Sequence, residues 1–157
     1  MNKSINIAVV GLGQVGSYLL NELNTKKKDI EIKTGKKINI VAISARNINK
    51  KRQFKINKKI FFKNSLEIFN KTSVDVLFEV IGQSDGVSKK IVETALKKKI
   101  HVITPNKALI SKHGNELAKI AELNNVNLEF EASVAGGIPI LRSIKEGLAT
   151  NKISKVY

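Results

Sequence analysis

The chain alternates between short apolar runs, which are typical of buried strands, and longer segments whose apolar residues recur at helical spacing. The first apolar run begins at Ile5 and ends at Gly11, where a glycine-rich turn leads into the first helical pattern. One face of that helix carries the apolar residues Val15, Leu19, Leu20 and Leu23. The pattern predicts a strand, a tight turn and a helix in immediate succession.

The same alternation continues along the rest of the chain. Further strands are predicted at Ile38–Ala45, Val74–Ile81, His101–Thr104 and Asn127–Glu131 and from Ile153 to Tyr157. Helices are predicted at Ser65–Asn70, with Ser65 as N-cap, and at Gly86–Lys99, Ala108–Asn124 and Ile140–Ala149. The polar segments between them are expected to be an exposed connection, Thr25–Lys37, and a loop or short helix, Asn47–Lys59. This alternation predicts an α/β fold, a doubly wound and mainly parallel sheet with helices on both faces.

The first turn has the spacing G-x-G-x-x-G, with its glycines at Gly11, Gly13 and Gly16. Between a strand and a helix, this spacing favours a Rossmann-like dinucleotide site. Gly11 would permit the sharp turn, Gly13 would let a diphosphate approach the backbone, and Gly16 would let the helix pack against the strand. The start of the helix would present its N–H groups to the phosphates. The alternative is a glycine-rich turn that binds nothing.

Composition narrows the class of protein. The 157 residues carry a formal net charge of +15, which is compatible with nucleic-acid binding. The lysines are scattered, however, and aromatic residues make up only 5% of the chain and do not interleave with them, so we expect a solvated basic surface and no nucleic-acid partner. There is no cysteine, no signal-peptide pattern and no apolar segment long enough to span a bilayer, so we expect a cytoplasmic protein without a membrane partner.

Ligands of doubly wound sheets bind outside the carboxyl ends of the strands, so residues that follow each strand are candidates. After the second strand, an Asp or Glu would suit the ribose of NAD, but the chain has Ala45 and Arg46, and Lys50 to Arg52 follow soon after. A guanidinium suits a 2′-phosphate, which favours NADP, although NAD is possible and Arg46 could be an ordinary surface residue.

Two later strand ends are also candidate sites. Lys107 follows a strand and a Pro-stiffened turn, where it could bind the cofactor, polarise a carbonyl or shuttle a proton. The segment Glu131–Pro139 places two consecutive glycines between a strand and a helix, which exposes backbone carbonyls and amides suited to an ion or a ligand. The alternative for that segment is a tight connection without a ligand.

Four segments together resemble the N-terminal part of homoserine dehydrogenase. They are GLGQVG at Gly11–Gly16, VDVLFEVIG at Val74–Gly82, KKIHVITPNKALISKHG at Lys98–Gly114 and FEASVAGGIPILRSIKEGLATNKI at Phe130–Ile153. Members of that family interconvert aspartate 4-semialdehyde and homoserine with NAD(P)H, on the route to threonine, methionine and isoleucine. The resemblance implies a small-molecule substrate and, for the full-length enzyme, a homodimer.

The resemblance also implies residue roles. The cofactor-binding residues would be Gly11, Gly13, Gln14, Val15, Gly16, Ala45, Arg46, Ile81, Gly82 and Lys107. Lys107 would lie at the nicotinamide and substrate side, with the main acid–base residues outside this chain. A monovalent cation such as sodium would be held, mostly through backbone oxygens, by Glu131, Val134, Gly136 and Ile138.

By the same resemblance, residues 1–135 would form the NAD(P)-binding domain, and residues 136–157 would begin the hinge, dimerisation and catalytic region. We therefore expect an incomplete enzyme chain that binds the cofactor and is inactive alone. A stand-alone redox sensor with an NAD(P)-binding domain is the alternative, although a sensor does not need Lys107 or the Glu131–Pro139 segment.

Overall fold

Six parallel strands form one sheet in the order β3-β2-β1-β4-β5-β6 in the computed structural model, which describes residues 4–50, 52 and 56–155. The strands are β1 (Ser4–Val10), β2 (Lys37–Ser44), β3 (Phe61–Phe62), β4 (Val76–Glu79), β5 (His101–Ile103) and β6 (Leu128–Glu129). Strand order reverses between β1 and β4, as in doubly wound nucleotide-binding sheets. The predicted fold class is confirmed, and the sheet is entirely parallel over the described residues.

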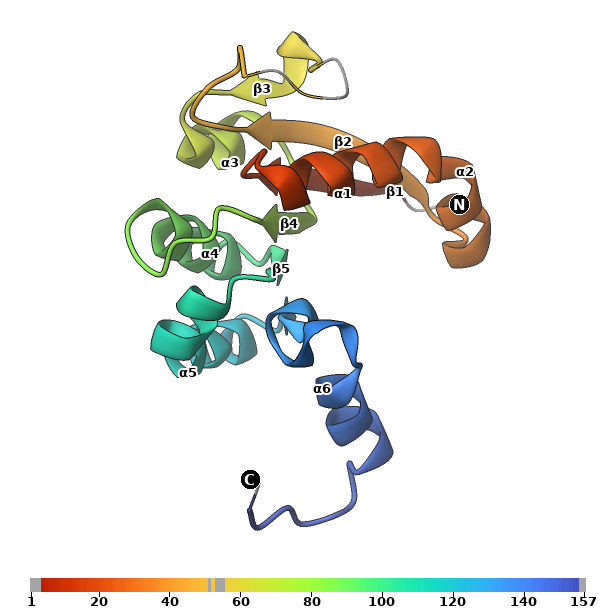
Figure 1. The fold of residues 1–157 in the computed structure, drawn as a ribbon, viewed down its shortest axis with the longest axis vertical. Helices are drawn as coiled ribbons and strands as arrows, with labels where there is room; N and C mark the ends of the chain where they lie inside the picture. Colours follow the sequence, from red (N-terminus) through yellow and green to blue (C-terminus); the bar gives the residue numbers. More distant parts are fainter. Residues whose placement is uncertain (1–3, 51, 53–55, 156–157) are drawn as a thin grey trace.

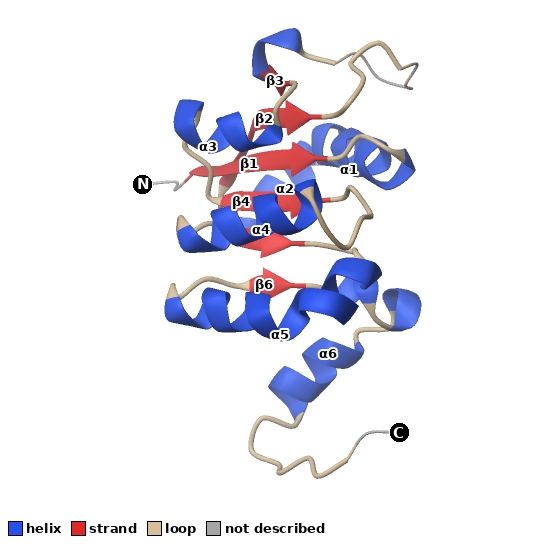
Figure 2. Cartoon of the chain, turned by 90° about the vertical axis from the view of Figure 1, so that its left-hand side faces the viewer, coloured by secondary structure: helices blue, strands red, loops and turns tan. Residues whose placement is uncertain are grey.

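Helices cover both faces of the sheet (Figures 1 and 2). They are α1 (Gln14–Thr25), α2 (Lys27–Thr34), α3 (Ile68–Lys71), α4 (Val87–Lys97), α5 (Lys107–Leu123) and α6 (Ile140–Arg142), and α6 continues into a π-helical turn at Ser143–Gly147. The helices α1 and α2 lie on one face, and α3, α4 and α5 lie on the other.

Alternation along β1 supplies both layers of the core. Ala8 and Val10 pack in one hydrophobic cluster with residues of α4 and α5, whereas Ile7 and Val9 pack in a second cluster with Leu20 and Leu23 of α1. A strand buried on both faces reads as a continuous apolar run, which is the pattern that predicted it. Because β1 is packed on both faces, the position of the glycine turn at its carboxyl end is fixed.

Three local predictions were wrong. The segment predicted as an exposed connection contains α2, which buries no residue and ends at Gly35 in the left-handed conformation. The cap near Ser65 is Asn64, whose side chain accepts a hydrogen bond from Leu66 N. No strand forms at residues 153–155, and 156–157 lie outside the described residues. Of the predicted loop at 47–59, Lys51 and residues 53–55 also lie outside them.

The carboxyl end of the described chain departs from the sheet. From α6 onward the backbone extends away from β6, and every described residue after Pro139 is exposed or half-buried (Figure 1). Among the described residues, no helix is both long enough and apolar enough to cross a membrane.

Candidate functional site

An open cleft of about 680 Å³ lies at the carboxyl ends of the strands, where the strand order reverses. Figure 2 shows this edge, toward which all the strand arrows point. The cleft is lined by Val10 to Gly13 at its base, by Ser44 to Asn47, Lys50, Arg52 and Lys63 to Leu66 on one side, and by Val80, Ile81, Gln83, Gly86, Val87 and Lys90 on the other. The glycine turn therefore lies between the two halves of the fold.

Each glycine of the turn has a different steric environment. Gly11 has a φ of 103°, and a Cβ there would collide with the carbonyl oxygen of Val80. A Cβ on Gly16 would overlap the carbonyl oxygen of Gly11 and would lie 2.9 Å from Val80 Cγ2. A Cβ on Gly13 would have no atom within 4 Å. Gly11 and Gly16 are thus required by packing, whereas the space beside Gly13 is open to the cleft.

The start of α1 borders this open space, because its N-cap, Gly13, lines the cleft. Gly13 is the N-cap of α1, and no side chain caps the helix there. Gln14 and Val15 are exposed, and the side chain of Val15 is directed away from the core. Backbone N–H groups in the first turn of a helix have no intrahelical partner, and the helix dipole adds a partial positive charge. An anionic group in the cleft would satisfy them.

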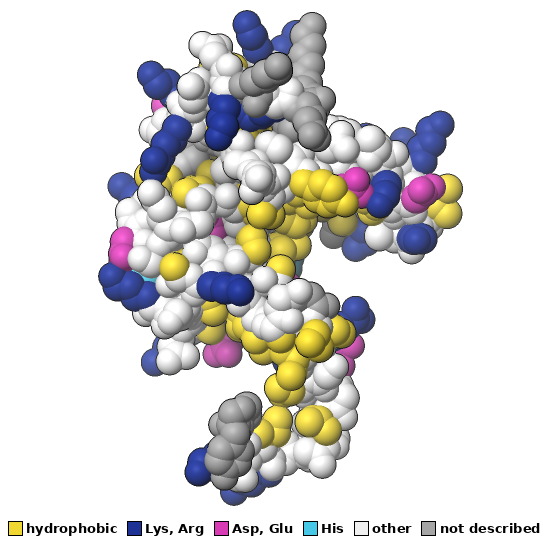
Figure 3. Space-filling model, in the orientation of Figure 1, with side chains coloured by type: hydrophobic (Ala, Val, Ile, Leu, Met, Phe, Trp, Pro, Cys, Tyr) yellow, Lys and Arg dark blue, Asp and Glu magenta, His cyan; other side chains and the backbone are white. Residues whose placement is uncertain are grey.

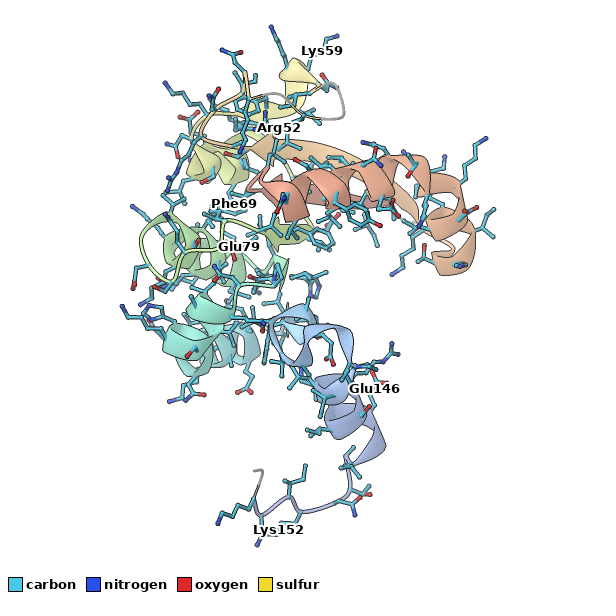
Figure 4. All side chains as sticks on the ribbon, viewed as in Figure 1. Arg52, Lys59, Phe69, Glu79, Glu146 and Lys152 are labelled. Carbon is cyan, nitrogen blue, oxygen red and sulfur yellow. The ribbon has the colours of Figure 1, made fainter. Side chains whose placement is uncertain are left out.

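The side of the cleft formed by β2 and β3 is basic. Arg46, Lys50 and Lys63 are all exposed there. Arg52 is labelled in Figure 4 and is engaged with the backbone: it donates to Asn47 O at 2.9 Å, Lys50 O at 2.9 Å, Ile48 O at 3.2 Å and Leu12 O at 3.4 Å. Arg52 therefore fastens the loop after β2 to the glycine turn. Lys51 lies outside the described residues.

Two residues before Ile81, which lines the opposite side of the cleft, β4 ends at a fully buried carboxylate, Glu79, which does not line the cleft itself (Figure 4). Its Oε1 accepts hydrogen bonds from Ile81 N at 2.8 Å and from Ser88 Oγ at 3.1 Å. Its Oε2 accepts one from Thr104 Oγ1 at 2.6 Å. Within the described part of the chain, no lysine, arginine or histidine forms an ion pair with it. Polar donors alone therefore stabilise this buried group.

Asn106 joins Glu79 to the helix that begins at Lys107. Its Nδ2 donates to Gln83 O at 2.8 Å and lies 3.3 Å from Glu79 Oε2, and its Oδ1 accepts from Leu109 N at 3.1 Å as the N-cap of α5. Asn106 is buried, whereas Lys107 is exposed and is not among the cleft-lining residues. The start of α5 is thus fixed by a network that excludes Lys107 itself.

A surface ion cluster ties the turn after Gln83 to α5. Asp85 contacts Lys112 Nζ at 2.8 Å and His113 Nε2 at 2.9 Å. The hydrogen bond from Lys112, followed by those from Ser84 and His113, holds the pKa of Asp85 well below its ordinary value of 3.8. These bonds favour the ionised carboxylate.

The Glu131–Pro139 segment makes a compact double turn. The Glu131 carboxylate accepts from Leu141 N at 3.0 Å and from Arg142 N at 3.1 Å, so it caps α6. Ala135 and Gly136 both have positive φ, at 50° and 58°. They lie in the second turn, in which Ile138 N donates to Ala135 O at 3.3 Å. The carboxylate is already engaged, so a cation held here would depend on backbone oxygens.

Residues 11–131 match a family model described as the NAD binding domain of homoserine dehydrogenase. The chain belongs to the homoserine dehydrogenase family. The resemblance seen in the four sequence segments is thereby confirmed.

Known homoserine dehydrogenases are similar to nearly the whole chain. Those of Neisseria gonorrhoeae and Bacillus subtilis are 37% and 35% identical to it over 154 residues, which is 98% of this chain and 35% of each relative. The crystal structure of homoserine dehydrogenase from Thiobacillus denitrificans matches 96% of this chain and 35% of its own, with a TM-score of 0.81 and 32% identity. For a Staphylococcus aureus homoserine dehydrogenase structure at pH 7.5, the TM-score is 0.78 at 40% identity, over 85% and 34% of the two chains. The chain spans about a third of the length of these relatives.

The homoserine dehydrogenase fold brings together only some of the residues predicted for cofactor binding. The predicted residues that line the cleft are Gly11, Gly13, Ala45, Arg46 and Ile81. Those that do not line it are Gln14, Val15, Gly16, Gly82 and Lys107. The cation candidates Glu131, Val134, Gly136 and Ile138 form the separate double turn beside α6.

Sequence reasoning missed two residues that hold the segments around the cleft in place. Glu79 lies in an apolar strand, where a lone carboxylate facing the core is itself a signal of a buried polar network. Arg52 was seen only as part of a basic run, and its contacts with four carbonyls have no signature in the sequence.

Proposed function

We propose that this chain is the cofactor-binding part of a homoserine dehydrogenase, an NAD(P)-dependent oxidoreductase that interconverts aspartate 4-semialdehyde and homoserine. The observation that carries the proposal is the uncapped start of α1 beside Gly13, at the point where strand order reverses. The family match over residues 11–131 supports a nicotinamide cofactor for this cleft.

Each wall of the cleft has a proposed task. The amides of Gly13, Gln14 and Val15 bind the cofactor diphosphate, because they are the donors at the uncapped helix start. Ala45 and Arg46 flank the adenosine ribose, since the loop after the second strand of this fold serves that end. Ile81 and Gly82, in the other half, lie beside the nicotinamide.

Lys107 is proposed to act at the substrate side. A reduced nicotinamide held in the cleft would supply the hydride for the aldehyde carbon, and the alkoxide formed there would need a proton donor. Lys107, at the start of α5, is an exposed amine that can approach such an oxygen. The main acid–base groups are expected from further parts of the enzyme, so this chain should bind the cofactor and turn over homoserine poorly or not at all.

NADP is the proposed cofactor in preference to NAD. The exposed cations Arg46, Lys50 and Lys63 line the half of the cleft expected to hold the adenosine ribose, and no acidic residue lines the cleft among the described residues. Those cations would bind a 2′-phosphate favourably, whereas ribose hydroxyls would lack the carboxylate that usually binds them. Calorimetric titration with NADPH and NADH tests this preference. Tighter binding of NADH would contradict it, and failure to bind either coenzyme would contradict the proposed function as a whole.

The division of the chain at residue 135 is also proposed. Hydrophobic side chains are exposed along α1 and on the α6 segment. Figure 3 shows hydrophobic side chains gathered between α1 and the carboxyl-terminal segment. Val15 and Tyr18 of α1 are 58% and 68% exposed, and Ile138 is 65% exposed. In the assembled enzyme, further residues should cover these side chains and form most of the homodimer contacts. Sedimentation of the chain alone should therefore give a weaker dimer than sedimentation of the assembled enzyme.

A monovalent cation such as sodium is proposed at the double turn of Glu131, Val134, Gly136 and Ile138. The two successive positive-φ residues, Ala135 and Gly136, support it, because they make this connection a tight turn of backbone groups. The engagement of the Glu131 carboxylate as a cap also supports it, because it leaves backbone oxygens as the cation ligands. Sodium titration followed by backbone NMR should shift residues 131–138 selectively. Equal shifts throughout the chain would indicate an ionic-strength effect and no site.

A further inference from the structure

We propose that Glu79 is a positioning residue for the nicotinamide half of the cleft: its buried carboxylate fixes the turn at Ile81–Gln83 and the start of α5, and through them Lys107. This inference rests on the proposed cofactor function of the same cleft. Glu79 itself is fully buried and lies outside the cleft lining, so its effect on a ligand must pass through the groups that it holds.

The first group that Glu79 holds is the turn after β4. Its Oε1 accepts from Ile81 N at 2.8 Å, and Ile81 lines the cleft. The next residue, Gly82, has a φ of 86°, a conformation that glycine adopts readily and other residues rarely do. On the far side of Gly82, Gln83 O accepts the 2.8 Å hydrogen bond from Asn106. One connected hydrogen-bond network therefore holds the turn on both sides of Gly82.

The second group is the start of α5. Thr104 Oγ1 donates to Glu79 at 2.6 Å and accepts from Asn106 N at 3.1 Å, so the hydroxyl bridges the carboxylate and the cap residue. The Asn106 amide then lies between Glu79 and Gln83. Lys107 follows directly, and the orientation of its backbone is set by that buried cap. A lysine on a long flexible stem gains precision only if its backbone is fixed in this way.

A carboxylate suits this position better than a neutral amide. Ile81 N and Asn106 Nδ2 can only donate: Ile81 N donates to Oε1, and Asn106 Nδ2 lies 3.3 Å from Oε2 and 3.4 Å from Oε1, so each oxygen of Glu79 faces at least one group that cannot accept. In Glu79→Gln, one of these oxygens becomes an NH₂ group with nearly unchanged shape. That NH₂ would face a donor, and either the turn or the cap would have to move.

The test compares two ligands on the 157-residue chain. NADPH spans both halves of the cleft, whereas adenosine 2′,5′-bisphosphate carries only the adenosine end. We expect Glu79→Gln to weaken NADPH by about tenfold or more and to leave the bisphosphate within about twofold. The fluorescence enhancement of the nicotinamide on binding should fall in the same variant, because the turn at Ile81–Gln83 no longer packs beside that ring.

Asn106→Ser removes the hydrogen bond to Gln83 O and keeps a residue that can cap α5. Serine still caps α5, but it is too short to reach Gln83 O, so we expect it to reproduce the selective loss of NADPH. Because this variant keeps the buried carboxylate, it tests the link from Glu79 through Asn106 to Gln83 even if Glu79→Gln does not fold. The matched control is Glu93→Gln on α4, whose carboxylate pairs with Lys97 at the protein surface. It should bind both ligands as the unmodified chain does.

The outcomes distinguish this inference from the proposed function. If the unmodified chain binds neither NADPH nor the bisphosphate, the proposed cofactor function is wrong. If it binds both, and a folded Glu79→Gln and Asn106→Ser lose affinity for both equally or for neither, the positioning role is wrong while the cofactor function stands. Only a selective loss of NADPH affinity and nicotinamide fluorescence supports the role of Glu79.

Discussion

Gly16 lies against the carbonyl oxygen of Gly11, so closely that a Cβ on Gly16 would overlap that oxygen. This contact brings the first turn of α1 onto the end of β1. Gly13 lies between these two residues in the sequence, yet a Cβ there would contact nothing. The three glycines of one motif therefore separate into two that packing requires and one whose small size matters only when a ligand is present.

Gly16→Ala should destabilise the fold. The added methyl group has no room beside Gly11 O and Val80, so α1 must move away from β1. We expect a loss of about 3 kcal/mol in the free energy of unfolding, measured by urea denaturation. Gly147→Ala is the control, because a Cβ there meets no atom within 4 Å. Equal stability of the two variants would contradict this view of the turn.

Gly13→Ala should leave the stability of the fold nearly unchanged and weaken the binding of NADPH. The methyl group fits the folded chain, so the free energy of unfolding should change by no more than about 1 kcal/mol. It would occupy the space where the diphosphate approaches the amides, and NADPH affinity should fall by about tenfold to a hundredfold. Calorimetry and urea denaturation of the same sample measure both effects. Unchanged NADPH affinity would mean that the ligand does not approach Gly13.

Substitutions of Arg46 and of Arg52 should affect the affinities for NADPH and NADH differently. Arg46→Ala removes an exposed cation and should weaken NADPH by about tenfold while leaving NADH unchanged. Arg52→Lys keeps the charge but cannot hold four carbonyls, so the loop after β2 should loosen and both coenzymes should bind more weakly. Lys98→Ala, at the far end of α4, controls for the loss of one positive charge. Equal loss of both coenzymes in Arg46→Ala would remove its role in selectivity.

Asp85 should contribute to the acid sensitivity of the fold. Its pKa is lowered in the folded chain, chiefly by the hydrogen bond from Lys112, so folding favours the ionised form. The contribution is fully present above the unfolded pKa near 3.8 and is lost as pH falls below it toward the folded value. The stability difference between the unmodified chain and Asp85→Asn should therefore shrink between pH 5 and pH 2.

Urea unfolding at several pH values measures that difference. Because Asp85 is exposed, 1 M salt should reduce it throughout. A difference that grows as pH falls would contradict the assignment.

The sequence predicted the parts of this structure that depend on local pattern. The apolar run of β1 and the spacing of Gly11, Gly13 and Gly16 were sufficient to place the turn, because strand burial and backbone sterics act over a few residues. It did not predict α2, which buries no residue completely: half-buried Ile30 packs against the core, Gly35 is the C-cap, and Lys27 pairs with Glu31 at the surface.

Contacts between distant segments were beyond the sequence. Glu79 meets Thr104 and Asn106 across 25 and 27 residues, and Arg52 meets Leu12 across 40. Nothing in the local pattern of either partner specifies such pairs, because they arise only once parallel strands align their carboxyl ends. The cap residue shows the same limit at short range: Asn64 and Ser65 are both good N-caps, and the backbone geometry decided between them.

The central claim is that the backbone amides at the start of α1 bind the diphosphate of a nicotinamide dinucleotide. Titration of the 15N-labelled chain with NADPH, followed by amide NMR, tests it at the atoms concerned. The account predicts that the amides of Gly13, Gln14 and Val15 shift first and saturate together with the nicotinamide fluorescence. Saturable binding that leaves those three amides unshifted would contradict it.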